Sequence, residues 1–234
     1  MTNKQIQMVM RDMLFVTWEV QPETARKLVD ERLKLDTRSD ALGREVAIVS
    51  AVCFHVTDVR STVLPIPRLS FEQVNYRVYV TARGIPSVCF IGMKVNSRMV
   101  TAMTSFLSVP IHYDDIEITT SARSSGMLAY VVKSRGLSAS AVLNQTNHET
   151  VSEETIAPEF ITERPAGYMT SGNGVFRINV EQSGLHAVPA RPQIVEAPIF
   201  EQLGLLTRDQ SARPSSVLYV REAPFGADAP VREW

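Results

Sequence analysis

Lysine is scarce in this chain of 234 residues, where it supplies only 5 of the 24 basic side chains. Chemistry that needs an amine nucleophile therefore has few candidates. Only Lys94 lies in a strongly apolar stretch, VCFIGMKV, where burial could make an amine reactive. We expect this side chain either to reach water along its own stem or to act as an amine nucleophile or base.

Cysteine and histidine are also few, and their positions suggest no ligand set. Cys53 and Cys89 both lie inside apolar runs, AVCFHV and SVCFIG, and the four histidines are scattered along the chain. This gives neither the spacing of a metal site nor a disulfide framework. We therefore expect two buried, unpaired thiols, no bound metal and no other cofactor.

Several classes of function are disfavoured by what else is missing. The net charge is −1, aromatic residues make up 7% of the chain, and no cluster of basic residues occurs, so we expect no nucleic-acid partner. No apolar run of 18 residues is present, so we expect no membrane partner and a cytoplasmic location. No glycine-rich phosphate loop, dinucleotide fingerprint or G-x-S-x-G motif appears.

The remaining pattern is typical of a mainly β protein with a few short α-helices. We expect strands at 12–20, 44–59, 71–80, 88–95, 115–122, 127–134, 137–145 and 216–224, with two more inside 160–183 around a Ser-Gly-Asn-Gly turn. We expect helices at 22–33, from Ser97 to a point before Pro110, and at 199–206. An irregular connection is expected at 63–69 and an exposed loop at 147–159. Residues 1–234 are expected to form a single domain whose sheet closes or wraps to protect its edges.

The stretch FEQVNYRVYV (71–80) carries the clearest candidate site. Its period-2 alternation places Gln73, Asn75, Arg77 and Tyr79 on one face of a strand whose other face is mostly apolar. One interpretation is a solvated sheet face. The other is an interior lined with hydrogen-bond donors, where the arginine would bind a carboxylate.

Three further residues are candidates with a structural alternative. His112 follows a proline at the exit of a helix, so it is either a surface residue or a group that titrates near neutrality and serves as acid or base. Glu163 and Arg164 are adjacent in FITERPAGY and would point to opposite faces of a strand. Either of the two could face a ligand, although a structural role is the simpler interpretation.

Taken together, several segments resemble the YqjF-like family of uncharacterised bacterial proteins, which is related in fold to acetoacetate decarboxylase. The matching segments are LFVTWEVQPE, FEQVNYRVYV, FLSVPIHY with the helix before it, FITERPAGY, FEQLGLL and SVLYV. Their order and spacing agree over nearly the whole chain. The chain departs from the family pattern at one acidic position, where Glu72-Gln73 replaces a glutamate at 73.

The resemblance implies a curved antiparallel sheet that closes into a barrel or cone around an interior pocket, with Asn75 and Arg77 facing that pocket. In acetoacetate decarboxylase, the segment after the corresponding helix ends in proline and two lysines, and the first lysine forms a Schiff base with the keto acid. Here Pro110 is followed by Ile111 and His112, and neither side chain can form a stable imine.

Three functions follow from this interpretation. The first is a pocket protein that works without a Schiff base, for example a lyase, dehydratase or isomerase that uses His112, Glu72 or Tyr79 for acid–base chemistry. The second is a non-catalytic module that binds or senses a small molecule. The third keeps imine chemistry and moves the amine to Lys94. In all three the expected ligand is a small organic acid or carbonyl compound, and a homo-oligomer is possible because relatives assemble.

Overall fold

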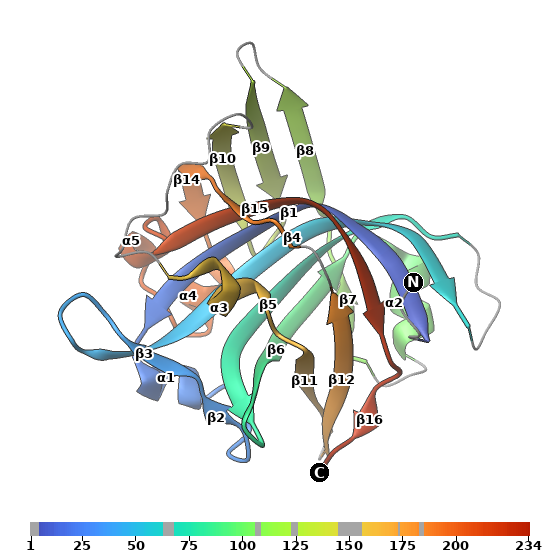
Figure 1. The fold of residues 1–234 in the computed structure, drawn as a ribbon, viewed down its shortest axis with the longest axis horizontal. Coiled ribbons are helices and arrows are strands. Elements are labelled where there is room, and N and C mark those ends of the chain that lie inside the picture. The colour runs from blue at the N-terminus through green and yellow to red at the C-terminus, as the bar shows by residue number, and fades with distance from the viewer. Residues whose placement is uncertain are drawn as a thin grey trace.

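Strands make up most of the protein (Figure 1). The computed structural model describes residues 5–62, 68–105, 109–122, 126–144, 156–172, 174–182 and 185–234. The strands are β1 (Ile6–Val20), β2 (Lys34–Leu35), β3 (Thr37–Ser39), β4 (Glu45–Ser61), β5 (Phe71–Ala82), β6 (Ile85–Val95), β7 (Ile111–Tyr113), β8 (Glu117–Ala122), β9 (Met127–Lys133), β10 (Ser138–Asn144), β11 (Ala166–Ser171), β12 (Gly174–Gln182), β13 (Val188–Pro189), β14 (Arg191–Glu196), β15 (Ser216–Ala227) and β16 (Val231–Arg232). The helices are α1 (Pro22–Arg26), α2 (Arg98–Ser105), α3 (Pro158–Thr162), α4 (Pro198–Gln202) and α5 (Arg208–Ser211), and within the described residues none is long and apolar enough to cross a membrane.

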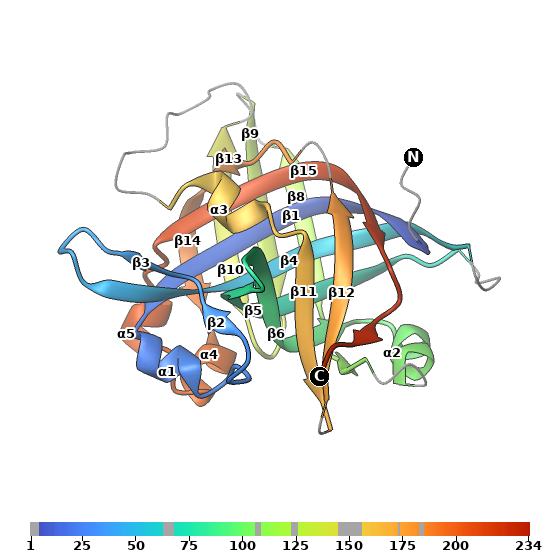
Figure 2. The same ribbon diagram turned by 60° about the horizontal axis from the view of Figure 1, so that its bottom comes forward.

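Seven strands of the larger sheet close into a hydrogen-bonded ring (Figures 1 and 2). The order around the ring is β1, β4, β5, β6, β11, β12 and β15, and β15 pairs again with β1. All of these pairs are antiparallel except β6 with β11, which is parallel. Closure satisfies the backbone groups that an open sheet edge would leave exposed.

Bulges change which residues of a strand face the interior of the ring. In β1 the pairing with β4 shifts between Arg11 and Leu14, where Asp12 has a φ of 49°, and in β4 it shifts near Asp58, with a φ of 53°. In both strands even-numbered residues line the interior on one side of the bulge and odd-numbered residues on the other. Aspartate tolerates this left-handed conformation better than most side chains. β6 has a third shift, at Ile91.

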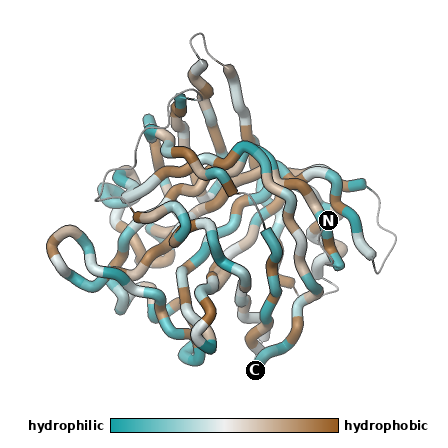
Figure 3. Tube along the Cα trace, in the orientation of Figure 1, coloured by the Kyte–Doolittle hydropathy of each residue, from teal (hydrophilic) through white to brown (hydrophobic). Residues whose placement is uncertain are grey.

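The ring has a hydrophobic core on each of its faces. The outer face packs against a second sheet with the strand order β14-β10-β9-β8, and Tyr76 and Cys53 from the ring meet Tyr130 and Val132 from that sheet. The inner face forms a separate core inside the ring. Hydrophobic stretches therefore recur along the ring strands in Figure 3, because these strands bury side chains on both faces.

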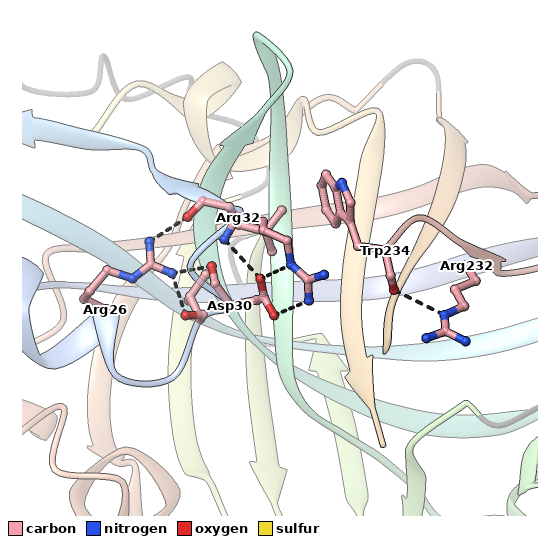
Figure 4. A network of polar contacts seen from close by, with 7 residues as sticks. Arg26, Asp30, Arg32, Arg232 and Trp234 are labelled. Carbon is pink, nitrogen blue, oxygen red and sulfur yellow. Dashed lines mark hydrogen bonds and ion pairs between the residues drawn. The ribbon is translucent and has the colours of Figure 1, made fainter. Parts of the chain in front are cut away.

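The structure confirms the predicted fold class and most of the predicted strands, but the helices differ. The helix expected at 199–206 is α4, which ends at Gln202, and α5 was not predicted. The helix expected at 22–33 ends at Arg26, and the Arg26 guanidinium donates hydrogen bonds to the carbonyl groups of Val29, Asp30 and Leu33 in the turn that follows (Figure 4). Residues 160–162 belong to α3 and not to a strand, since a proline occupies the first turn and starts a helix. Residues 63–67 and 145–155, in the predicted connection and loop, lie outside the described residues.

Polar contacts hold the turn after α1 near the far end of the chain (Figure 4). Arg32 forms two hydrogen bonds with the Asp30 carboxylate, and this contact lowers the pKa of Asp30 to about 2. The Arg32 guanidinium also lies 5.6 Å from the ring of Trp234, which stacks on Tyr168. These contacts join the segment after α1 to the C-terminal residue.

Candidate functional site

A cavity of about 550 Å³ lies inside the ring. Strands β1, β4, β5, β6, β12 and β15 contribute to its wall, and α2 and β7 line part of it. The wall is mainly apolar, and methionines are prominent in it. These are Met8, Met10, Met13, Met93 and Met103.

Arg77 is the principal polar group in this wall. The alternation of β5 directs it into the cavity beside Gln73 and Asn75, which hydrogen-bond to each other at 2.7 Å. One terminal nitrogen of Arg77 donates to the Tyr79 hydroxyl at 2.6 Å and to the Ile161 carbonyl at 2.8 Å. The interpretation of this strand face as an interior lined with donors therefore describes its geometry better than a solvated face does.

Arg77 is half-buried, and it has no counter-charge among the described residues. Its Nε has no hydrogen-bond partner, and the ion pairs of the described residues do not include it. Burial lowers the pKa of the guanidinium, an effect that the neighbouring Tyr79 opposes. A buried cation costs several kcal/mol unless it is paired. An anion in the cavity beside Arg77 would therefore lower the energy of the site.

Tyr79 supports Arg77 from behind the cavity wall. The tyrosine is completely buried, and its hydroxyl contacts Ser50 Oγ at 3.0 Å, which in turn contacts Thr17 Oγ1 at 2.7 Å. The same hydroxyl donates to the Ile161 carbonyl at 3.1 Å. Tyr79 does not line the cavity, so it acts as a positioning residue for the guanidinium.

Arg164 reaches the cavity wall but already has a carboxylate partner. Its side chain is 3% exposed, and it forms an ion pair with Asp36 at 2.5 Å and donates to the Phe160 carbonyl at 2.8 Å. The adjacent Glu163 is exposed at the surface, as expected for neighbours that point in opposite directions. Arg164 therefore contributes positive charge at the site, and Glu163 lies outside it.

Like Tyr79, the other three predicted acid, base and amine candidates lie outside the cavity. Glu72 is on the outer face of β5, where its carboxylate accepts a hydrogen bond from the Ile118 amide at 3.1 Å and lies 3.5 Å from His55. Burial raises the pKa of Glu72 and lowers that of His55. His112 is exposed on β7, and Lys94 alternates away from the cavity-lining Met93. The geometry gives these side chains no contact with a ligand in the cavity.

Sequence reasoning missed other polar members of the wall because they come from separate elements. They are Ser61, Thr104, Gln182 and Asp228. No motif links them, and only the closure of the ring brings them together. Ile111 also lines the cavity, at the position that the resemblance assigns to the Schiff-base lysine.

Comparison with known proteins identifies the family. The family model of DUF2071, described as an uncharacterized conserved protein, matches residues 7–224. The chain belongs to the DUF2071 family. It is also 27% identical over 171 residues to the uncharacterized protein YqjF of Bacillus subtilis (strain 168), an alignment that covers 70% of this chain and 67% of that protein. These matches confirm the resemblance drawn from the sequence.

Solved structures share the fold of this DUF2071 protein at low sequence identity. Acetoacetate decarboxylase from Legionella pneumophila matches with a TM-score of 0.66 and 11% identity, over 98% of this chain and 87% of that one. The enduracididine biosynthesis enzyme MppR complexed with pyruvate matches with a TM-score of 0.59 and 13% identity, over 99% and 91%. The chain therefore has the acetoacetate-decarboxylase-like fold. At this identity the likeness establishes the fold alone.

Proposed function

We propose that this protein binds a small organic acid inside the ring, with Arg77 holding the carboxylate of the ligand. The Arg77 guanidinium carries this proposal, because it lines the cavity and no described carboxylate pairs with it. Gln73 and Asn75 lie on the same strand face and can accept or donate hydrogen bonds beside it. An acid that entered the cavity would supply the missing counter-charge.

The site supports binding without a Schiff base. Ile111 occupies the cavity wall where the resemblance to acetoacetate decarboxylase would place the lysine, and Lys94 points to the other face of β6. Among the described residues that line the cavity there is no lysine, histidine or cysteine. Borohydride reduction in the presence of acetoacetate, followed by mass spectrometry, should therefore leave the protein unmodified, and an adduct on Lys94 would contradict this view.

A binding or sensing protein is the function that the described wall supports best, and an acid–base enzyme is the second candidate. The second candidate is favoured by the enzymes among the structural neighbours and by Asp228, a carboxylic acid in the wall. A lyase, dehydratase or isomerase would need such a group within reach of the bound acid. The two unpaired thiols are compatible with a reducing compartment such as the cytoplasm.

A panel of carboxylic acids, screened by thermal shift and confirmed by calorimetry, tests the proposal. Acids should raise the melting temperature of the wild type, because a ligand that binds only the folded state stabilises it. Arg77→Met should lower the affinity at least tenfold, since charge-assisted hydrogen bonds to a carboxylate are lost. Arg38→Met, which changes a partly exposed arginine outside the cavity wall, is the matched control and should bind like the wild type.

Two outcomes would contradict or redirect the proposal. Binding that is equally strong in the Arg77→Met variant would show that the guanidinium is not the anchor. Turnover of a bound acid, lost in Asp228→Asn while binding is kept, would favour the acid–base enzyme over the binding protein.

A further inference from the structure

We infer that the ligand of this cavity is a monocarboxylic acid with an extended apolar chain, and not a short keto acid. The inference rests on the proposed function, because it takes Arg77 as the carboxylate anchor. The inference adds which part of the ligand the apolar wall beyond Arg77 would contact. Neither the fold nor the family specifies this.

The size of the cavity favours a large ligand. An apolar cavity of about 150 Å³ is sufficient to hold one benzene molecule. The cavity here has about 550 Å³, which corresponds to roughly twenty non-hydrogen atoms on the same scale. A keto acid of six or seven such atoms would leave most of the apolar wall in contact with water, and its binding would gain little from the hydrophobic effect.

The shape of the wall gives the ligand a direction. The ring of Phe15 lies 5.2 Å from the Arg77 guanidinium, so this end of β1 adjoins the anchor. From Phe15 the cavity wall follows β1 through Met10 and Met8 to Ile6, a path of at most about 30 Å at the usual rise per strand residue. A chain that starts at Arg77 would therefore run between apolar side chains along the strand.

The Asp12 bulge makes this apolar path continuous. Without the bulge, the alternation that directs Phe15 and Met13 inward would direct Met10 and Met8 to the outer face. Methionine is unbranched and adapts to irregular ligands. The wall is therefore suited to a flexible chain, and it should accept several chain lengths.

A chain-length series provides the test on the wild-type protein. The probes are butanoate, hexanoate, octanoate and decanoate, with pyruvate and acetoacetate as short keto acids, each measured by calorimetry at concentrations where it does not self-associate. Each added methylene should lower the Kd roughly three- to fourfold, the gain expected for burying one CH₂ group. Decanoate should therefore bind at least a hundredfold more tightly than butanoate.

Two variants locate the two ends of the ligand. Arg77→Met should weaken all chain lengths by a similar factor, and decanol should bind the wild type at least tenfold more weakly than decanoate. Met8→Trp narrows the far part of the path, so it should weaken decanoate at least tenfold while hexanoate binds as it does to the wild type. If Met8→Trp does not fold, the series on the wild type still decides the question.

The outcomes separate the inference from the proposed function. A Kd that does not change with chain length, or tighter binding of pyruvate than of decanoate, would overturn the inference that the ligand has an extended apolar chain. If Arg77→Met still weakened binding in that case, the proposal that the cavity binds an organic acid would stand. Failure of every acid to bind, or equal binding to Arg77→Met, would overturn the proposed function itself. Equal binding of decanol and decanoate would overturn the carboxylate anchor.

Discussion

Two arginines lie at the same end of the cavity and differ in what they contact. The guanidinium groups of Arg77 and Arg164 both lie near Tyr79, at 5.0 and 4.9 Å from the centroid of its ring. Arg164 has the carboxylate of Asp36, whereas the partners of Arg77 among the described residues are neutral oxygens. We therefore expect Arg164 to have a structural role and Arg77 to be the arginine that a ligand contacts.

Stability measurements should distinguish the two arginines. Arg77→Met should change the free energy of unfolding by no more than about 1 kcal/mol, because Tyr79 still donates to the Ile161 carbonyl and no carboxylate is left unpaired. Arg164→Met should cost roughly 3 kcal/mol, since it leaves Asp36 without its partner. Urea denaturation of the two variants measures both values. A large loss for Arg77→Met would assign that residue a structural role.

At the scale of single elements, the bulges decide which side chains line the cavity. A sequence pattern with period 2 predicts one face for a whole strand, and β5 follows it from Gln73 to Arg77. In β4 the alternation changes at Asp58, so Val59 and Ser61 face the cavity although their parity would place them outside. Asp58, whose backbone conformation permits this change of face, is exposed, and its residue type alone does not predict a bulge.

Substitutions at Asp58 test the cost of this bulge. Asp58→Gly should leave stability equal or higher, because glycine adopts a positive φ without strain. Asp58→Val should cost about 1–2 kcal/mol, because a β-branched residue is strained in the left-handed region. Arg60→Val, an exposed position in the same strand, is the matched control and should change stability by less than about 0.5 kcal/mol. Equal stability of the two valine variants would show that the backbone relaxes at the bulge.

At the scale of the whole molecule, ring closure brings distant segments to one site. Arg77 lies in β5, and the carbonyl group that it contacts belongs to Ile161, 84 residues later. The predicted burial of Cys53 and Cys89 is confirmed, and both thiols are unpaired in the core outside the ring. Each can meet a reagent only when the structure around it opens.

Thiol labelling therefore reports on the opening of the whole structure. In the native protein both cysteines should react far more slowly than a free thiol, because burial raises the pKa of Cys53 and raises that of Cys89 to about 12. In denaturant two thiols should react at once. The labelling rates of the two should fall together as denaturant is removed, and rapid labelling of only one would show that its part of the sheet opens separately.

The sequence by itself determined the fold class, the burial of both cysteines and the polar face of β5. These features follow from local composition and alternation, and a family pattern spans nearly the whole chain. The same reasoning proposed His112, Glu72 and Lys94 as acid, base or amine groups of the site. That proposal depended mainly on residue type. Whether such a side chain meets a ligand depends on which strand face it occupies and what packs there.

Only the tertiary structure decided which residues share the cavity. The ring places Arg77, Asp228 and Ile111 in one wall although they come from segments far apart in the chain. Bulges at Asp12 and Asp58 reverse the alternation partway along their strands, which no period-2 pattern anticipates. The physical reason is that local alternation sets a face only between bulges, whereas the pairing of distant strands sets which faces meet.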